Sequence, residues 1–551
     1  MNPLLQVDIY KVSHEAFMPK GTTKIYSNFT ARSNKHLNVN KERYDGKVVN
    51  FGLQHFIKDF LIKSFNEEFF AKPKEEVIGY FKRVMDAHLG KDSVDLTRFN
   101  SLHDLGYLPI EIKALPEGSL VDIKVPLLTI TNTHPDYAWL TNYLETVLSQ
   151  ELWKPITIAT IIREYRKLGN EYALKTTGSI AGTEFQFHDF SARGMSGRYD
   201  SSINGAAFLL SSNGSDTISA IEVLENSYNA DVTQEFVGAS VAASEHSVSC
   251  LGTSVDSELE SYKKWITEDY PTGIVSLVSD TYDYWRVLTE YLPKLKDLIL
   301  ARPVNEIGLS KVVIRPDSGN PADIICGLKV ISYKDLEGYL SFSESYKADK
   351  FHVVEKDGEY FEFHIDSAYS DIFNETYDHS IELGDKVDSA IVKGSVELLW
   401  ETFGGTVTEQ GYKVLDSHIG LIYGDSITPA VALDVFQRLE AKGFASTNIV
   451  FGVGSYTMQY VTRDSLGMAV KATYAEVNGV GYELFKDPIT DSGMKKSAKG
   501  LLRVEKEGDN FVLYDQQTKE QEAQGELKTV FLNGELILQT SLTEIRQRLW
   551  S

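Results

Sequence analysis

The stretch LysValValIleArgProAspSerGlyAsnPro (311–321) joins a short β-branched run directly to a polar turn. Such a run predicts a buried parallel strand, because strands covered on both faces are almost continuously apolar. Further runs of this form are Phe185–Phe190 before SerAlaArgGly, Gly273–Ser279 before Asp280, Ile419–Tyr423 before GlyAspSer, and Asn448–Phe451 before GlyValGlySer. Their repetition predicts an α/β sheet or barrel.

Helical patterns separate these runs. The segment Thr428–Lys442 has Thr428 as a candidate N-cap, Pro429 at the first helical position and Gly443 just past the end. In a barrel the carboxyl ends of the strands converge on one face. The polar residues that follow each run are therefore predicted to lie together.

The sequence on either side has other patterns. Residues 1–150 mix amphipathic helices, predicted at Phe51–Phe65 and Lys74–Leu89, with strand-like pieces. Residues 501–551 contain short strands around an Asn533–Gly534 turn, a strong hairpin signal. A Tyr-, Asp- and Ser-rich stretch at about 330–392 contains another hairpin, around a LysAspGlyGlu turn, and looks like an insertion. We predict an N-terminal mixed α/β segment (1–150), an α/β barrel (151–500) carrying the insertion, and a C-terminal hairpin segment (501–551).

Charge and composition exclude several classes of function. The chain has 55 Lys and Arg against 78 Asp and Glu, a net charge of −23, which repels nucleic acid and anionic membranes. No apolar run approaches the roughly 18 residues that span a bilayer, and residues 1–20 lack a signal or transit pattern, so we expect a cytoplasmic protein. The cysteines, Cys250 and Cys326, are interpreted as reduced core thiols. A small molecule is the expected partner.

Three of the strand ends carry groups suited to a phosphorylated sugar. The guanidinium group of Arg315 can bind phosphate through two parallel N–H donors, and Asp317 can bind a ribose hydroxyl or Mg²⁺. Gly424 with Asp425, and Gly454 with Ser455, follow other strands and offer backbone N–H groups. Ordinary turns and a salt bridge are the alternative interpretation of each cluster taken alone.

Other residues carry possible chemistry outside these three clusters. Phe190 and Arg193 follow the first strand, Asp216 lies in a polar turn, and Glu245 stands beside His246, where it can orient and charge the imidazole. For Phe190 a core position, and for His246 a structural hydrogen bond, are the alternatives. Basic residues are enriched downstream at Arg463, Lys471 and Lys486. Metalloprotease, α/β-hydrolase and Walker-type motifs are absent from the sequence.

Nine motifs occur in an order that covers nearly the whole chain except about 330–392. They are AspIleTyrLysValSerHis (8–14), HisAspPheSerAlaArgGly (188–194), GlySerAspThr (214–217), GluHisSer (245–247), ValSerAspThrTyrAsp (278–283), IleArgProAspSerGlyAsnPro (314–321), TyrGlyAspSer (423–426), ThrArgAsp (462–464) and PheLysAspPro (485–488). Together they resemble the nicotinamide phosphoribosyltransferase family. The resemblance implies a type II phosphoribosyltransferase fold, an irregular α/β barrel with flanking β-rich and helical segments, in a homodimer to which residues 1–150 contribute.

The resemblance also implies a reaction of NAD salvage, in which nicotinamide and phosphoribosyl pyrophosphate give nicotinamide mononucleotide and pyrophosphate. Mg²⁺ is the implied cofactor, although the sequence does not identify its ligands. ATP is an implied optional activator through a phosphohistidine at His246.

Residue roles follow by motif. Phe190 and the partner subunit's Tyr10 are implied to stack on the pyridine, while Asp216 accepts from the carboxamide. The implied ribosyl and phosphate contacts are Arg315, Asp317, Gly424, Asp425, Gly454 and Ser455, and Ser276 is a further substrate-binding candidate. The pyrophosphate or phosphate side is implied to be lined by Arg193, His246, Arg32 and basic residues near Arg463, Lys471 and Lys486 from the partner. His246, Arg315 and Asp317 are the catalytic candidates.

Two other functions compete with this one. Nicotinate phosphoribosyltransferase shares the implied fold and leaving group, but a carboxylate at Asp216 repels an acid substrate. A non-catalytic interaction protein on the same scaffold is expected to have lost one or more strand-end clusters, and all are present here.

Overall fold

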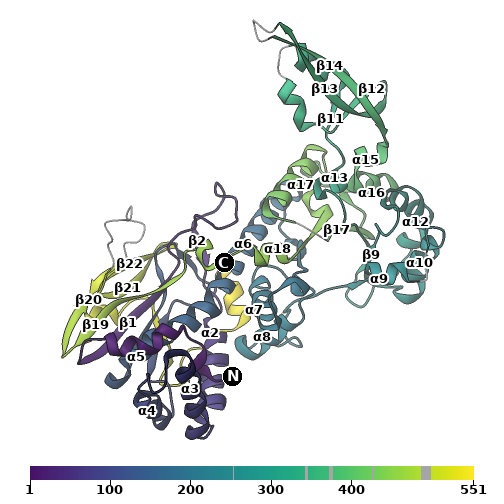
Figure 1. The fold of residues 1–551 in the computed structure, drawn as a ribbon. Helices are drawn as coiled ribbons and strands as arrows, with labels where there is room; N and C mark the ends of the chain where they lie inside the picture. Colours follow the sequence, from purple (N-terminus) through teal and green to yellow (C-terminus); the bar gives the residue numbers. More distant parts are fainter. Residues whose placement is uncertain (252–253, 342–344, 372–375, 425–426, 486–497) are drawn as a thin grey trace. The chain divides into compact units, whose positions relative to one another are not determined.

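The computed structural model describes the chain in two compact units. The described residues are 1–251, 254–341, 345–371, 376–424, 427–485 and 498–551. Unit 1 comprises Met1–Glu164, Ser191–Gly238 and Met458–Ser551, and unit 2 comprises Tyr165–Phe190 and Ala239–Thr457. Helix α6 (Glu145–Thr177), labelled in Figure 1, has residues 145–164 in unit 1 and residues 165–177 in unit 2. No helix among the described residues is both long and apolar enough to cross a membrane.

Unit 2 is built on a parallel sheet. Its neighbouring strands are, in order, β6 (Phe187–Asp189), β18 (Ile449–Val453), β17 (Ile419–Tyr423), β10 (Ser310–Arg315), β9 (Gly273–Val278) and β8 (Ala242–Ala243). Each of these pairings is parallel, with Val312 opposite Val275 on one side and Ile419 on the other. The predicted strands and the α/β class are confirmed.

Aromatic packing fixes helices against one end of this sheet. Phe187 on β6 and Phe451 on β18 stack with centroids 5.6 Å apart, and Phe436 of α17 (Pro429–Ala441) meets Phe451 at 5.3 Å. Tyr165 of α6 packs edge-on against Phe187, and its hydroxyl donates to the Ile427 carbonyl at 2.8 Å. Buried aromatic pairs of this kind add stability beyond the area that they bury. The ends of β6 and β18 are therefore firmly placed.

Helix α17 starts as its sequence predicts. The Thr428 side chain accepts a hydrogen bond from the Val431 N–H, Pro429 is the first helical residue, and Gly443 has φ +75° just past the end. A capping hydroxyl satisfies a backbone donor that the helix itself leaves open.

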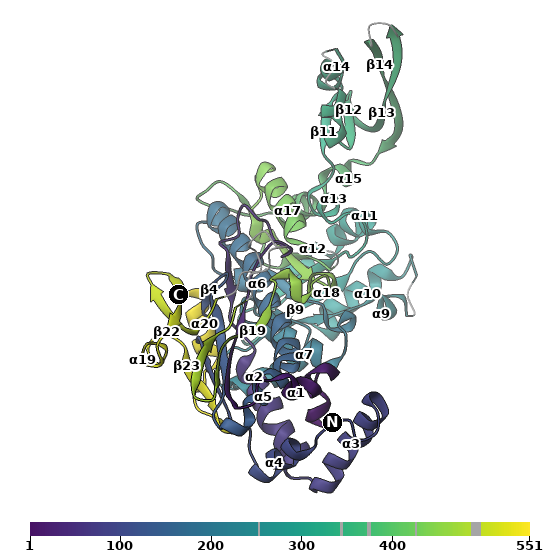
Figure 2. The same ribbon diagram turned by 60° about the vertical axis from the view of Figure 1, so that its left-hand side comes forward.

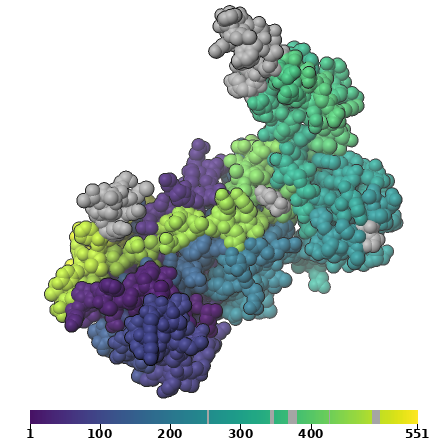
Figure 3. Space-filling view, viewed as in Figure 1, coloured from purple at the N-terminus to yellow at the C-terminus, as the bar shows by residue number. Residues whose placement is uncertain are grey.

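Unit 1 contains an antiparallel sheet that draws on both ends of the chain. Its strands are, in order, β20 (Val480–Glu483), β19 (Ala469–Val477), β1 (Thr22–Thr30), β5 (Pro126–Asn132), β3 (Ile110–Ala114), β23 (Lys528–Leu532) and β24 (Glu535–Leu536). In the space-filling view the N-terminal segment, in purple, lies directly against the yellow-green C-terminal segment (Figure 3). Neither segment forms this sheet alone.

Helices accompany the sheet in unit 1. The predicted helix Lys74–Leu89 is α3, and α4 (Thr97–Leu105) packs beside it through Phe81 and Phe99, whose ring centroids are 4.7 Å apart (Figure 2). Helix α2 (Leu53–Phe56) continues into a stretch of π-helix, Ile57–Ser64, over most of the segment predicted to be helical.

The predicted hairpins are also confirmed. Strands β23 and β24 pair around Asn533 and Gly534, whose φ values of +50° and +89° suit a type I′ turn. At the C-terminal end, β21 (Leu501–Glu507) pairs with β22 (Asn510–Gln517). In the predicted insertion, β11 (Val330–Ser332), β12 (Val353–Lys356), β13 (Glu359–Asp371) and β14 (Thr376–Val387) form a separate sheet, in that order. That sheet packs on its own small core, which includes Leu336 and Val354.

One prediction about the cysteines is wrong. Both are free thiols and Cys326 is buried, but Cys250 is exposed at the end of the short helix α9 (His246–Cys250). The predicted core position for Cys250 fails because α9 leaves this residue on the surface.

Candidate active site

The ends of β9 and β10 are cross-linked by one carboxylate. The Ser279 N–H donates to the Arg315 carbonyl at 3.1 Å, which extends the pairing of the two strands by one residue. Beyond it, Asp280 Oδ2 accepts hydrogen bonds from the Asp317 N–H at 3.0 Å and from the Ser318 hydroxyl at 2.5 Å. The two acidic strand ends are therefore held against each other.

An imidazole faces both carboxylates. His246 Nε2 lies 3.3 Å from Asp280 Oδ1 and 3.8 Å from Asp317 Oδ1. The Asp280 side chain is only 4% exposed, and its Oδ1 makes no hydrogen bond with any described residue. One ligand atom from each of these three residues lies within 4.8 Å of the others. Two carboxylates and an imidazole are a donor set that fits a divalent cation such as Mg²⁺ or Mn²⁺.

The two carboxyl groups have opposite pKa shifts. Burial pushes the pKa of Asp280 upward, but the hydrogen bonds from Ser318 and Asp317 and the nearby His246 outweigh burial and hold this pKa below its usual value. Burial and the negative charge of Asp280 raise the pKa of Asp317, against the opposing effects of His246 and Arg315. A neighbouring cation relieves such crowding of negative charge.

Arg315 is tied to the segment that carries His246. Its Nη2 donates to the Ser244 carbonyl at 2.8 Å, and the Ser244 N–H donates to the Ser276 carbonyl at 2.9 Å. The Ser276 hydroxyl is buried and makes no hydrogen bond with any described residue. Because a buried hydroxyl without a partner is costly, Ser276 is suited to receive a ligand or a water.

Glycine is required where Phe190 crosses the end of β18. The Phe190 N–H donates to the Val453 carbonyl at 3.0 Å. A Cβ atom at Gly452 would lie 2.4 Å from Phe190 Cδ2, and one at Gly424 would lie 3.3 Å from Asp317 Cβ. By contrast, a Cβ at Gly454 meets nothing within 4 Å. The absence of a side chain at Gly452 therefore leaves the space that the Phe190 ring occupies, while the space beside Gly454 is open to a ligand.

Unit 2 thus brings together many of the predicted site residues. Those found at or beside the strand ends are Phe190, His246, Arg315, Asp317, Gly424, Gly454 and Ser455, of which Ser455 begins α18 (Ser455–Gln459). Ser276 lies within β9. Asp425 and Lys486 lie outside the described residues.

The other predicted residues belong to unit 1. Tyr10 lies in a short 3₁₀ helix with 55% of its surface exposed, and Arg32 Nε donates to the Gly467 carbonyl at 2.9 Å. Arg193 is exposed in the 3₁₀ turn Ala192–Gly194, and Asp216 follows β7 (Gly214–Ser215). Arg463 pairs with Asp464 at 3.8 Å, and Lys471 lies on β19.

Sequence reasoning missed Asp280 as a site residue. In the sequence it is the polar residue that follows Gly273–Ser279 and part of a motif, and neither pattern gives it a role of its own. The available signal was its place after β9, which is equivalent to that of Asp317 after β10.

Comparisons with known proteins identify relatives of this chain. The model of the nicotinate phosphoribosyltransferase family matches residues 185–535, and that of the nicotinamide phosphoribosyltransferase N-terminal domain matches residues 2–112. A nicotinamide phosphoribosyltransferase of Acinetobacter baylyi is 50% identical over 100% of this chain and 97% of its own length. A protein of the same name from Mycoplasma pneumoniae is 31% identical over 89% of this chain and 92% of its own length. Another, from Xanthomonas campestris pv. campestris, is 29% identical over 99% of this chain and 97% of its own length.

Proposed function

The chain belongs to the nicotinamide phosphoribosyltransferase family, and we propose that the strand-end cluster of unit 2 carries the reaction. The enzyme transfers the phosphoribosyl group of phosphoribosyl pyrophosphate to nicotinamide, which gives nicotinamide mononucleotide and pyrophosphate. The whole-length match to relatives of that name carries this conclusion. The two-carboxylate, one-imidazole cluster carries the choice of site.

The chemistry asks the protein for alignment and charge. The pyridine nitrogen of nicotinamide has a lone pair and no proton to lose, so no strong base is needed at this step. The bond from C1 of the ribose to pyrophosphate breaks as the bond to nitrogen forms, and positive charge develops on the sugar. The protein accelerates the step by aligning ring and sugar and by stabilising the departing pyrophosphate.

We assign the sugar and its phosphate to the strand ends. Arg315 and Asp317 hold the ribosyl moiety, supported by their place at the end of β10. Gly424, Asp425, Gly454 and Ser455 hold the 5′-phosphate and ribose, supported at Gly454 by its open backbone. The buried hydroxyl of Ser276 takes a polar group of the substrate.

We assign the pyridine to Phe190, with Asp216 accepting from its carboxamide and Tyr10 of a second subunit covering the other ring face. Exposed aromatic residues in the N-terminal segment support a homodimer, because Tyr10 is 55% exposed and Phe17 82%. In this proposal the pyrophosphate or phosphate side is lined by Arg193, His246, Arg32 and the partner subunit's basic residues near Arg463, Lys471 and Lys486.

Asp280, Asp317 and His246 would hold Mg²⁺. Bound there, the cation would neutralise negative charge on the pyrophosphate.

ATP is the further partner that we propose. Its γ-phosphoryl group is transferred to a ring nitrogen of His246 as the bond to ADP breaks, and this transfer adds negative charge beside Asp280 and Asp317. Because phosphorylated sugars are polyanions that do not cross bilayers unaided, we also propose that the enzyme works in the cytoplasm.

Replacing Asp216 by Asn should shift the choice between amide and acid. Nicotinate would place its carboxylate about 4 Å from Asp216, and at an effective dielectric constant near 20 the two charges repel by about 4 kcal/mol. Nicotinamide instead donates a charge-assisted hydrogen bond to Asp216, which contributes roughly 1.5–3 kcal/mol. We expect the ratio of kcat/KM for nicotinamide over nicotinate to fall at least about tenfold. Mononucleotide formation from each substrate measures it. Asp136→Asn, at an 83% exposed carboxylate, is the control, and an unchanged ratio in Asp216→Asn would show that Asp216 does not read the carboxamide.

Gly452→Ala should displace Phe190, because the added Cβ collides with its ring. We expect KM for nicotinamide to rise about tenfold or more, with a smaller change in KM for phosphoribosyl pyrophosphate. Gly454→Ala adds the same methyl group into open space and should leave KM for nicotinamide within about twofold. Equal effects of both variants on KM for nicotinamide would refute the proposal that Gly452 positions Phe190 against the pyridine ring.

Variants of the acidic cluster should separate cation binding from phosphorylation. Asp280→Asn and Asp317→Asn remove ligand charge, so Mn²⁺ affinity, measured by electron paramagnetic resonance, should fall at least about tenfold.

His246→Ala should abolish the incorporation of acid-labile phosphate from ATP and the stimulation of the enzyme by ATP, but it should leave measurable basal turnover. Asp297→Asn, an exposed carboxylate on α12 (Leu292–Leu300), controls for charge. Parental Mn²⁺ affinity in a folded Asp280→Asn protein would rule out this cation site.

Mixed subunits should report a shared site. Tyr10→Ala and Asp216→Ala enzymes should each be nearly inactive, but a re-equilibrated mixture should recover roughly a quarter of parental activity. Half of the dimers are then heterodimers, and each has one intact site. Failure to recover activity despite proven exchange of subunits would mean that Tyr10 does not act across the interface.

A further inference from the structure

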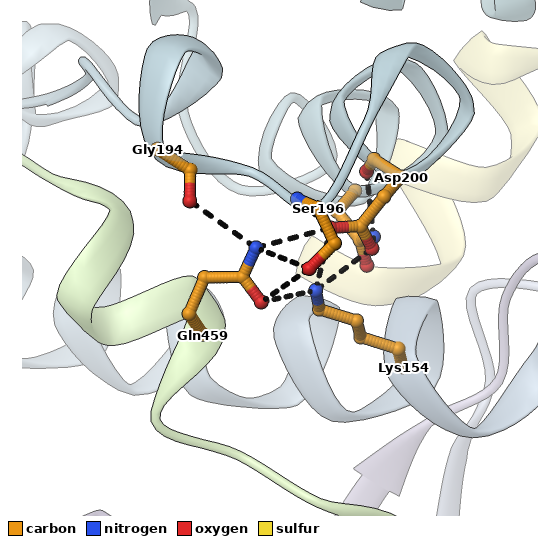
Figure 4. A network of polar contacts seen from close by, with 6 residues as sticks. Lys154, Gly194, Ser196, Asp200 and Gln459 are labelled. Atoms are coloured by element: carbon orange, nitrogen blue, oxygen red, sulfur yellow. Dashed lines mark hydrogen bonds and ion pairs between the residues drawn. The ribbon is translucent and has the colours of Figure 1, made fainter.

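A buried ammonium group lies at the centre of a closed polar network in unit 1 (Figure 4). Lys154 of α6 is 8% exposed, and its Nζ lies 2.7 and 2.8 Å from the two carboxylate oxygens of Asp200 and 3.0 Å from Gln459 Oε1. An ammonium group has three protons and no acceptor. These three contacts use its whole capacity, so Lys154 has no proton left for a substrate.

Asp200 connects this ammonium group to the chain just before α7 (Arg198–Phe208). Its Oδ2 accepts the Ser196 N–H at 2.9 Å, and its Oδ1 accepts from Asn204 Nδ2 at 2.9 Å. Asp200 lies in the first turn of the helix, where a negative charge is favoured. The carboxylate thus fixes the path by which the chain enters α7.

Gln459 holds the same stretch from another side. Its Nε2 lies 3.3 Å from the Gly194 carbonyl and 3.0 Å from the Ser196 hydroxyl. Because Lys154 can only donate and the Gly194 carbonyl can only accept, the orientation of this amide is determined by its partners. Gly194 and Ser196 are therefore both held, and Arg193 immediately precedes them.

Arg193 is the part of this stretch that the network leaves available. Its side chain is exposed, and none of the described carboxylates pairs with it. A buried ion pair stabilises a protein weakly, because desolvation offsets most of the attraction between the charges. Lys154 is buried and Asp200 is half-buried, with 20% of its side chain exposed, so stability alone is a poor reason for this pair.

We propose that Lys154 and Asp200 are positioning residues that set Arg193 for the pyrophosphate group of the substrate. The inference rests on the proposed function, in which Arg193 faces the phosphate side of the site. When the backbone that carries Arg193 is fixed before the substrate binds, less conformational entropy is lost on binding. The affinity for phosphoribosyl pyrophosphate should therefore be higher, and the effect should appear mainly in KM for this substrate.

Three variants test the proposal. Asp200→Asn keeps the shape and an acceptor for the Ser196 N–H, Lys154→Met keeps an unbranched side chain, and the double variant removes both charges, so that no charge is buried alone. We expect KM for phosphoribosyl pyrophosphate to rise about tenfold in the double variant, with KM for nicotinamide within about twofold. Lys82→Met with Asp86→Asn is the matched control, because it removes an equivalent pair, 2.6 Å apart, on the surface of α3.

A purely structural role would change the melting temperature without this split between the two KM values. A folded double variant with parental KM for phosphoribosyl pyrophosphate would therefore overturn the proposal, as would an equal rise of both KM values.

Arg193→Ala separates this inference from the proposed function. Its KM for phosphoribosyl pyrophosphate should rise, and adding the Lys154 and Asp200 substitutions should raise it no further, because all act through the same guanidinium. A parental KM in Arg193→Ala would overturn the role of Arg193 and the inference with it. A raised KM in Arg193→Ala with additive effects of the pair would overturn the inference alone.

Discussion

The site depends on the hydrogen bonds that Asp280 accepts after β9. Parallel pairing brings β9 and β10 to the same edge, but the pairing ends at Ser279 and Arg315, and the chain beyond is irregular. There the Asp280 carboxylate replaces a strand as the acceptor for the Asp317 N–H and also accepts from Ser318. Without it a backbone donor loses its partner, at a cost of about 1–3 kcal/mol where it is buried. The same carboxylate therefore fixes the turn that carries Asp317 and faces His246 with its other oxygen, 3.3 Å from Nε2.

The net charge of the chain opposes the binding of its anionic substrate. The chain carries −23 overall, and its substrate and its leaving group are polyanions, so the average field of the protein opposes binding. Asp280 and Asp317 add more negative charge at the place where the sugar is assigned. A cation would relieve this crowding, so the raised pKa of Asp317 and an Asp280 Oδ1 that accepts no hydrogen bond from any described residue support the proposed assignment of Mg²⁺ to the cluster.

Local rules predicted the elements well. The strand ends, the cap at Thr428 and the Asn533–Gly534 turn each depend on a few adjacent residues, so the sequence contains their whole signal. The role of Asp280 depends on which strands become neighbours, and the exposure of Cys250 depends on how α9 packs. Lys154 and Asp200 are separated by 46 positions in the sequence, and no short motif links them. Contacts of this kind follow from tertiary packing, which local patterns do not encode.

The state of the hydrogen-bonding atoms distinguishes two kinds of polar cluster in this molecule. At the strand ends of unit 2, Ser276 Oγ and Asp280 Oδ1 are buried without a hydrogen bond to any described residue, so a ligand can gain energy by meeting them. Around Lys154 each ammonium proton already has an acceptor, so a ligand gains nothing by approaching it. An unsatisfied cluster is suited to binding, and a satisfied one is suited to holding the chain in place. The same chemical groups can therefore serve as binding or as positioning residues, according to what their neighbours leave unpaired.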